Sequence, residues 1–445
     1  MKIKWIQVVM LAGICSSFAW AKTSERVLFS FNQKDGSTPD AGLVADKQGN
    51  LYGTTFDGGP NGMGNVFELS PTKGGGWKET VLHDFKGSDG AGPVSSLIFD
   101  DAGNLYGTAE VGGQGKCTNT GLGCGVVFEL SPGKNGWKYT TLYSFVPGKT
   151  KGVIPTGGLV LDKAGNLYGT TWAPGLVGGP LRARTRAPSA NTYWGCDKPG
   201  CGGTVYRLAP SKDGWKETDL YAFRGDSDGA ASVAGLIFDA AGNLYGTTNY
   251  GGTTGCTSGY GCGVVFELTP GKTGWKESVL HRFTGGSDGA YPMASVVLDT
   301  AGNLYSTVST GGNGNDCKML YSTGCGVVFE LVSAKGKWHE QVLYSFKGGA
   351  DGASPFATVI MDSHGNIYGT TFTAGDPNHP SGVVFKLVPS GSDWTEKVLH
   401  TFTYGHGDGQ SPAAPLIFGP GGYLYGTTVG GGASTLYGTV FAVTP

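Results

Sequence analysis

A seven-residue motif, Gly-Asn-Leu-Tyr-Gly-Thr-Thr, recurs along the chain and constrains its fold more than any other feature. It first occurs at residues 49–55 and ends with a diverged copy at residues 422–428. The tyrosines of the seven copies are separated by 54, 62, 77, 60, 63 and 57 residues, at Tyr52, Tyr106, Tyr168, Tyr245, Tyr305, Tyr368 and Tyr425. A self-similar period of this size is the signature of a repeat architecture in which each unit is one supersecondary structure.

Each repeat has the residue pattern of four short strands. In the first repeat these are residues 42–45, 51–55, 66–70 and 77–85, here called strands A, B, C and D. Val, Leu, Phe, Tyr and Thr fill the strands, and Asp, Gly and Pro fill the turns between them. No helical period competes with this pattern after the first 21 residues. Four antiparallel strands repeated seven times predict an all-β fold, a seven-bladed β-propeller.

The distribution of strands between the chain ends distinguishes a closed ring from an open β-solenoid. Six repeats end in a strand D, but the seventh ends with strand C at residues 438–444. The missing strand is found at the other end, at residues 26–31 (Arg-Val-Leu-Phe-Ser-Phe). We therefore expect the N-terminal strand to complete the last blade and to close the ring. An open solenoid does not join its two ends, so it would not need this arrangement.

The sequence predicts a targeting segment followed by one domain. Residues 1–21 combine Lys2 and Lys4, an apolar stretch and a small-x-small cleavage site at 19–21, as in a signal peptide. The protein is then exported, to the periplasm or the extracellular space, and no later apolar run is long enough to span a membrane. Residues 22–445 form a single propeller, with repeat units at approximately 42–85, 93–145, 156–223, 233–283, 293–346, 356–402 and 413–445 plus 26–31.

The cysteines fit an exported protein. After Cys15 leaves with the signal peptide, the eight that remain form four close pairs, each in the same part of its own repeat. Metal binding is the alternative, but no pair has Cys-x-x-Cys spacing. In an oxidising compartment local disulfides are favoured, with the pairs Cys117–Cys124, Cys196–Cys201, Cys256–Cys262 and Cys317–Cys325.

Charge excludes some classes of partner. Removing residues 1–21 takes away two lysines and no acids, which leaves 30 basic and 34 acidic side chains. A chain with this slight excess of negative charge has no net positive charge with which to attract nucleic acid or anionic lipid. We expect a monomer without a cofactor.

The repeats resemble a known family. The recurring Asp-x-x-Gly-Asn-Leu-Tyr-Gly-Thr-Thr, followed by Gly-Val-Val-Phe-Glu-Leu and Trp-Lys-Glu, is similar to the Gloeobacter/Verrucomicrobia ("GloVer") tandem repeat of exported bacterial proteins. The similarity covers the whole chain after residue 21. It implies a secreted bacterial repeat protein, and it brings no established reaction and no catalytic residue.

Chain topology places every long, variable loop on one face of the propeller. In an up-and-down blade the B–C loops and the D–A crossovers share a face, here called the loop face, and the tight A–B and C–D turns lie opposite. Loops on a rigid scaffold commonly carry function. The longest loop, residues 172–202, holds aromatic and basic residues typical of a surface that binds sugar or a partner. The alternative is a decorative insertion whose Trp packs against its own disulfide. The candidate ligand-binding residues are Trp172, Arg182, Arg184, Arg186, Tyr193 and Trp194.

Six of the D–A crossovers contain Asp-Gly. The six carboxylates are candidate ligands for a cation near the mouth of the central channel, although capping of a turn is the commoner role of Asp-Gly. They are Asp35, Asp89, Asp228, Asp288, Asp351 and Asp408, with Lys151-Gly152 as the exception.

The sequence contains none of the local motifs that would mark an active site. Nucleophile-elbow, zinc-protease, phosphate-loop and dinucleotide motifs are all missing, so no catalytic residue is assigned. The sequence favours a secreted, disulfide-braced binding or scaffold module for carbohydrate or protein over an enzyme. The alternative is an extracellular polysaccharide lyase or hydrolase with its site at the channel mouth, because propeller enzymes often gather catalytic residues from several blades.

Overall fold

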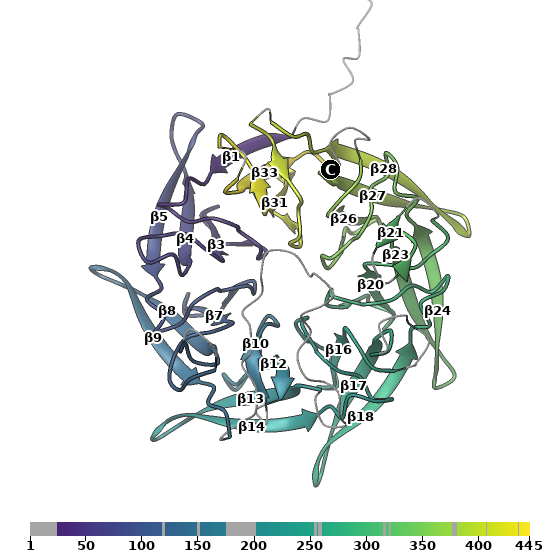
Figure 1. Cartoon of the computed structure of the whole chain (residues 1–445), viewed down its shortest axis with the longest axis horizontal. Coiled ribbons are helices and arrows are strands. Elements are labelled where there is room, and N and C mark those ends of the chain that lie inside the picture. The colour runs from purple at the N-terminus through teal and green to yellow at the C-terminus, as the bar shows by residue number, and fades with distance from the viewer. Residues whose placement is uncertain are drawn as a thin grey trace, which may run out of the picture.

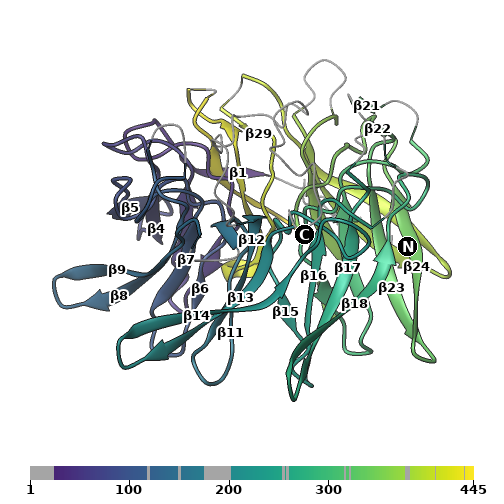
Figure 2. The ribbon, with the colours of Figure 1, turned by 60° about the horizontal axis from the view of Figure 1, so that its bottom comes forward.

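A computed structural model of the chain describes residues 25–117, 121–148, 152–174, 202–252, 256, 260–314, 317–319, 322–375, 381–405, 407–434 and 436–445. The seven blades stand in a ring (Figure 1; seen tilted in Figure 2), and each contains four antiparallel strands in the order A-B-C-D. The predicted seven-bladed β-propeller is therefore confirmed. The predicted signal peptide lies outside the described residues. Within the described residues, no helix is long and apolar enough to cross a membrane.

The first four blades follow one another along the chain from strand A to strand D. Blade 3 has an additional strand, β10, which pairs with the extended end of β12. Their strands are β2 (Val44–Ala45), β3 (Leu51–Thr55), β4 (Asn65–Pro71) and β5 (Trp77–Asp84); β6 (Ile98–Phe99), β7 (Leu105–Ala109), β8 (Val126–Gly133) and β9 (Gly136–Ser144); β10 (Gly152–Pro155), β11 (Val160–Leu161), β12 (Leu167–Pro174), β13 (Thr204–Ser211) and β14 (Gly214–Ala222); β15 (Ile237–Phe238), β16 (Leu244–Thr248), β17 (Val264–Gly271) and β18 (Gly274–Arg282).

Blades 5 to 7 repeat the plan, and two small ladders lie in their loops. The strands of the three blades are β19 (Val297–Leu298), β20 (Leu304–Val308), β23 (Val327–Ala334) and β24 (Lys337–Ser345); β25 (Ile360–Met361), β26 (Ile367–Thr371), β27 (Val383–Ser390) and β28 (Asp393–Thr401); β30 (Ile417–Phe418), β31 (Leu424–Thr428), β33 (Thr439–Val443) and β1 (Arg26–Ser30). The ladders are β21 (Lys318–Met319) with β22 (Ser322–Thr323) and β29 (Gly409–Gln410) with β32 (Gly430–Gly431), and a single 3-10 turn, η1, covers Pro420–Gly422.

The ring closes as the strand count predicted. Strand β1 pairs antiparallel with β33 and forms the outer strand of blade 7, beside the C-terminal part of the chain (Figure 1). Phe31, which follows β1, is 1% exposed and packs edge-on against Phe67 of blade 1. The N-terminal segment therefore completes one blade and packs against the next.

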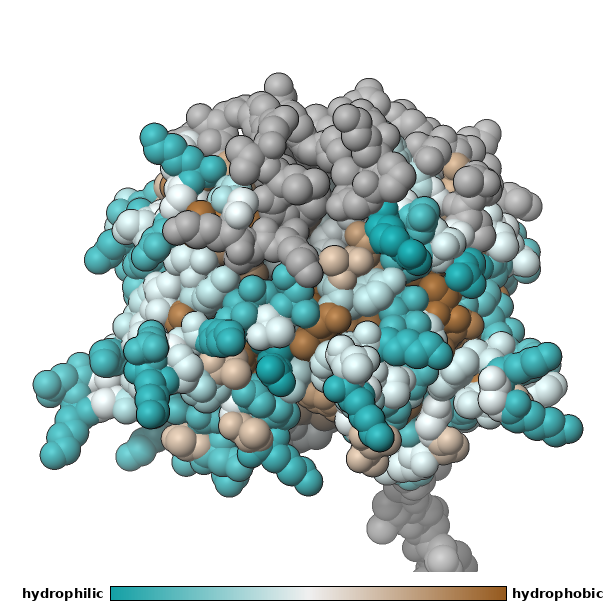
Figure 3. Space-filling view, turned by 90° about the horizontal axis from the view of Figure 1, so that it is seen from below, coloured by the Kyte–Doolittle hydropathy of each residue, from teal (hydrophilic) through white to brown (hydrophobic). Residues whose placement is uncertain are grey.

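The hydrophobic core lies between the blades. Each of seven clusters joins two neighbouring blades across their boundary, here called a seam. In the seam between blades 1 and 2, for example, Tyr52 and Phe85 pack with Leu105 and Phe128. Both faces of each sheet are thus covered, and the described surface on the side of the ring seen in Figure 3 is mostly hydrophilic with small hydrophobic patches.

Two local details differ from the sequence expectation. Strand A is shorter than predicted, because only Val44–Ala45 pairs with strand B in blade 1. The glycine inside strand B was expected to admit a neighbouring backbone, but a Cβ on Gly53 would meet the ring of Phe67 at 2.6 Å and the side chain of Leu43 at 3.0 Å. The space is needed by side chains of the same blade, and blade 5 has Ser306 at this position.

Candidate functional site

The recurring Asp–Asn–Tyr pattern forms the A–B turn and is structural. In the first repeat, Asp46 Oδ1 accepts hydrogen bonds from the backbone N–H groups of Gln48 and Asn50, both at 2.9 Å. Its Oδ2 accepts from Asn50 Nδ2 at 2.7 Å and from the hydroxyl of Tyr52 at 3.1 Å. One carboxylate thus satisfies four donors and fixes strand B to the turn. The most repetitive residues of the chain are therefore turn and seam residues, and the search for a site moves to the opposite face.

The loop face is built on a main-chain clamp that recurs at all seven seams. The crossover residue two positions after Asp-Gly has a left-handed backbone, with φ between 55° and 63°. Its N–H donates at 2.7–3.0 Å to a carbonyl in the B–C loop of the preceding blade. The donors and acceptors are Thr38 and Tyr437, Gly92 and Met63, Ile154 and Cys124, Ala231 and Gly202, Tyr291 and Cys262, Ser354 and Cys325, and Ser411 and Ser381.

Three predicted disulfides are confirmed, and each supports one of these clamps. The bonds are Cys117–Cys124, Cys256–Cys262 and Cys317–Cys325. In each pair the second cysteine supplies the carbonyl that accepts the hydrogen bond of the clamp. The fourth predicted pair, Cys196–Cys201, lies outside the described residues. A covalent loop therefore holds the acceptor in place at three seams.

Reduction is expected to loosen these loops without opening the ring. Loops of five to seven residues between partners contribute roughly 2–3 kcal/mol each in the chain-entropy model, while the ring is held by the hydrophobic seams. We expect a lowered Tm and a retained sheet signal in circular dichroism after reduction. Peptide mapping of the oxidised protein should recover only bridges within one repeat, and a bridge between blades would contradict the assignment.

Aromatic side chains occupy the loop face over blades 4 to 6. Tyr250 lies 5.7 Å from Tyr291 and 6.0 Å from Tyr260 between ring centroids. Phe356 and Phe372 of blade 6 lie 5.0 Å apart with their planes tilted by 51°. Tyr260 is 38% exposed and the other four are partly buried. We refer to these five residues as the aromatic arc.

Tyr291 holds the most constrained position in the arc. It is the clamp residue of blade 5, and its φ of 58° is unusual for a bulky side chain. The other clamp positions carry Thr, Gly, Ile, Ala or Ser. Main-chain outliers of this kind are frequent at ligand sites, and the disulfide Cys256–Cys262 fixes the loop that also presents Tyr260.

The sequence-predicted ligand residues are only partly described. Trp172 lies in β12, is partly buried, and packs against the hydrophobic cluster of the seam between blades 2 and 3, so for this residue packing is the observed role. Arg182, Arg184, Arg186, Tyr193 and Trp194 lie outside the described residues. The hypothesis that they bind a ligand stays a prediction.

The crossover aspartates cap their turns. Each accepts a hydrogen bond from the backbone N–H at the start of its crossover, for example from Lys86 to Asp89 at 2.8 Å. Five of them also contact a ring on strand D, at 2.8–3.5 Å. The pairs are His83 with Asp89, Tyr221 with Asp228, His281 with Asp288, Tyr344 with Asp351, and His400 with Asp408. The strand D histidines, which were interpreted as packing residues, therefore also hold the crossover.

Sequence reasoning missed a partly buried glutamate at the same seams. It stands two residues after the strand D Trp in blades 1, 4, 5 and 6, and blade 3 has Glu217 at the same position. Glu25 occupies the equivalent position before β1. Burial raises the pKa of Glu25 to about 7, the negative charge of Asp408 adds to the rise, and His400 opposes it. Burial and a nearby aspartate likewise raise the pKa values of the other four to about 7, at Glu79, Glu277, Glu340 and Glu396. The recurring Trp-x-Glu was the signal that could have found them.

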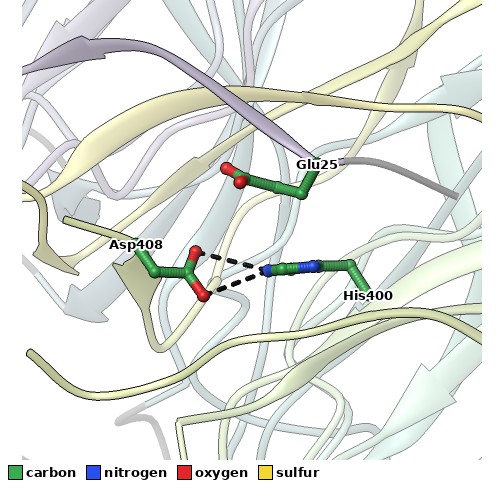
Figure 4. Close-up of side chains that lie close together, drawn as sticks. All are labelled: Glu25, His400 and Asp408. Atoms are coloured by element: carbon green, nitrogen blue, oxygen red, sulfur yellow. Dashed lines mark hydrogen bonds and ion pairs between the residues drawn. The ribbon is translucent and has the colours of Figure 1, made fainter. Parts of the chain in front are cut away.

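The seam between blades 6 and 7 gathers three groups that could hold a metal ion. The ligand atoms of Glu25, His400 and Asp408 all lie within 4.8 Å of one another. Figure 4 shows the three side chains converging, with His400 Nε2 at 3.2 and 3.3 Å from the two carboxylate oxygens of Asp408. Glu25 directly precedes the outer strand of blade 7, His400 belongs to the outer strand of blade 6, and Asp408 belongs to the crossover between these blades, so the cluster lies away from the central axis.

The family assignment follows from the whole length of the chain. A family model of the Gloeobacter/Verrucomicrobia repeat matches residues 10–181, 183–323 and 318–445. The chain belongs to the Gloeobacter/Verrucomicrobia repeat family. The resemblance predicted from the motif is thereby confirmed, and the Gloeobacter/Verrucomicrobia repeat corresponds here to propeller blades. No curated protein matches the chain in sequence.

Several solved structures are similar to this Gloeobacter/Verrucomicrobia repeat protein over most of its length, at low sequence identity. A putative 6-phosphogluconolactonase from Bacteroides uniformis has 13% identity and a TM-score of 0.45, with 81% of this chain and 84% of that chain covered. A gluconolactonase from Xanthomonas campestris has 14% identity and a TM-score of 0.41, with 95% and 90% covered. A glucose dehydrogenase has 14% identity and a TM-score of 0.42, with 95% and 99% covered. Similarity at this level carries no information on activity.

Proposed function

We propose that the protein is an exported binding module whose loop face docks a carbohydrate through the aromatic arc. The observation that carries the proposal is the group of Tyr250, Tyr260 and Tyr291, placed at the edge of a disulfide-braced loop. Aromatic rings offer a large, rigid contact area with a polar edge, which suits the flat faces of sugar rings. Because the clamps and disulfides fix the backbone before binding, little conformational entropy is lost when a ligand docks.

A binding role is favoured over the alternative of a lyase or hydrolase at the channel mouth. In each described histidine–aspartate pair the histidine lies on strand D, the outer strand of its blade, and contacts the aspartate of the crossover that follows. These side chains therefore fix the crossover to the strand. Three disulfides also fit the oxidising compartment that export provides. A protein ligand is the second possible occupant, and it is an outcome of the test below.

Binding to a panel of soluble plant and bacterial polysaccharides tests the proposal. Tyr260→Ala and Trp194→Ala are each expected to weaken binding by ~1–3 kcal/mol, as for aromatic anchors, with little change in Tm. Phe418→Ala is the matched control, because Phe418 is 45% exposed but lies at the A–B turn on the opposite face. Affinity should be measured by calorimetry and products by chromatography.

Each outcome has a defined meaning. Saturable binding without product supports the module, and product release supports the enzyme alternative. Lost stability with unchanged affinity in Trp194→Ala would show that this side chain packs beneath its loop. If the panel shows no binding and an extracellular protein is captured through Tyr260, the ligand is a protein and the carbohydrate proposal is wrong.

A further inference from the structure

We propose that Glu25, His400 and Asp408 form a binding site for a divalent transition-metal ion, with Zn²⁺ as the best fit, which fastens the N-terminal strand to blade 6. This site is separate from the aromatic arc and does not depend on the proposed function. It involves one of the six aspartates predicted as cation ligands, but at a seam and with two partners that the sequence did not indicate.

Three separate segments bring the ligands together. Glu25 directly precedes β1, His400 lies in β28, and Asp408 lies in the crossover that follows β28. Their ligand atoms are all within 4.8 Å of one another. The side chains of His400 and Asp408 are 19% and 11% exposed. Ligands that share one ion with bonds of about 2.0–2.2 Å stand roughly 3–3.5 Å apart, so the site closes on an ion by a small movement of Glu25.

The donor set suits zinc better than calcium or magnesium. Zn²⁺ accepts both imidazole nitrogen and carboxylate oxygen as ligands, and a site with three protein ligands keeps water in the fourth position. Calcium and magnesium prefer oxygen ligands only. Two carboxylates beside a neutral imidazole carry two negative charges, which a divalent ion neutralises.

A second observation points to a missing partner at this seam. Glu25 Oε1 is buried and accepts no hydrogen bond from any described residue. An oxygen of the equivalent glutamate at four other seams is likewise without a partner among the described residues, at Glu79, Glu277, Glu340 and Glu396. Glu25 differs from these in belonging to a set whose histidine, aspartate and glutamate ligand atoms all lie within 4.8 Å of one another. A buried carboxylate oxygen without a partner is costly, and the charge of Asp408 adds to the cost. A bound cation supplies the partner and offsets both effects.

The other seams show what the histidine adds. In the seam between blades 5 and 6, Tyr344 takes the place of the histidine and donates its hydroxyl to Asp351 at 3.1 Å, with Glu396 nearby. The same fold is therefore built without a nitrogen ligand. The seam between blades 4 and 5 has His281, Asp288 and Glu340, but within the described part of the chain only the Glu25 set brings three ligand atoms within 4.8 Å.

The chain itself thus supplies the variants for a test. His400→Tyr introduces the residue found at this position in blades 3 and 5, where Tyr221 and Tyr344 donate to the crossover aspartate. It therefore removes the nitrogen ligand and keeps the hydrogen bond to the aspartate. Glu25→Gln keeps the size of the side chain and removes its charge. His281→Tyr makes the matched change at the seam between blades 4 and 5 and serves as the control.

The experiment is a zinc titration of tag-free, EDTA-treated protein at pH 7.5, followed by calorimetry and thermal unfolding. We expect one equivalent of Zn²⁺ to bind with a micromolar or lower Kd and to raise the Tm, with reversal by EDTA. His400→Tyr and Glu25→Gln should each weaken binding at least tenfold, and His281→Tyr should bind as the parent does. Absence of saturable binding to the parent protein, or unchanged binding by folded His400→Tyr, would overturn the proposal. Anomalous diffraction at the zinc edge should place the ion between β1 and β28.

Discussion

A chain that begins at residue 32 is expected to lose the native ring under conditions in which the protein that begins at residue 22 is fully folded. The deletion removes β1, so β33 loses its pairing partner and blade 7 keeps three strands. An exposed apolar strand edge is a template for aggregation. The deletion also removes Phe31, which is fully buried against Phe67 and whose N–H donates to the carbonyl of Gly438.

The side chain of Phe31 alone indicates how much stability the deletion removes. Phe31→Ala alone is expected to cost about 3–5 kcal/mol of unfolding free energy, as for other buried phenylalanines. Phe402→Ala is the matched comparison, because Phe402 has the equivalent place on strand D of blade 6 and is also fully buried. Similar losses in the two variants would show that the N-terminal strand is an ordinary member of the ring.

The deletion is best measured by thermal unfolding and light scattering, with a rescue. Adding a synthetic peptide of residues 22–36 should restore the Tm and the monodisperse state, because the peptide can supply the missing strand and Phe31. A deletion product with the Tm of the longer protein and no aggregation would show that blade 7 does not need β1.

The second large effect concerns pH, because stability is expected to fall as pH rises from 5 to 8. The pKa of Glu79, Glu277, Glu340 and Glu396 is raised from the ordinary 4.5 to about 7 in the folded protein, first by burial and then by a neighbouring charge. The folded state therefore binds more protons than the unfolded state between these two values. By linkage, the stability present below pH 4.5 is lost progressively up to about pH 7.

The groups that face these glutamates decide the size of the effect. Aspartates stand beside each of the four, at Asp35 and Asp84, Asp228, Asp288 and Asp351, while cations or a histidine oppose them only in part, at Arg224, Arg282, His281 and Lys347. Because the glutamates are about half buried, solvent screening reduces each contribution to the order of 1 kcal/mol. Burial lowers the pKa of His83, which acts in the opposite direction on acidification but is a single group.

A pH series of melting temperatures tests this expectation. The parent protein should show a Tm several degrees higher at pH 5 than at pH 8, and a fourfold Glu→Gln variant should flatten the profile. Glu68→Gln is the control, since Glu68 lies on the adjacent strand β4 and accepts a hydrogen bond from Ser70. A flat profile in the parent would mean that these carboxyl groups are solvated in solution.

The architecture was predictable because the sequence pattern of one blade recurs seven times along the chain. Strand count and the position of residues 26–31 sufficed for the closed ring, since each blade needs an outer strand and only one segment was left to supply it. The seam contacts were less visible. The ring of His83 meets the carboxylate of Asp89 at the end of β5, where the pairing with β4 has a bulge. Reasoning from the alternation of side chains does not place a bulge.

The site was harder to predict than the fold. Glu25 and His400 are 375 positions apart, and their contact exists only because the ring closes between them. The aromatic arc depends on which crossovers face which loops, and single tyrosines such as Tyr260 have no repeat partner to draw attention to them. The long insertion attracted the sequence interpretation because it broke the period, and most of it lies beyond the described residues.

The main-chain clamp has a consequence for how such a protein can diversify. At each seam the clamp is made by one N–H and one carbonyl, so it makes few demands on side chains beyond tolerance of a left-handed backbone. Side chains on the loop face, including that of the clamp residue Tyr291, are thus not needed for the main-chain hydrogen bonds that join the blades. Loops can gain length or exchange side chains, as between repeats of 54 and 77 residues, without loss of the hydrogen bonds that join the blades. This separation makes the scaffold suitable for grafting new recognition loops.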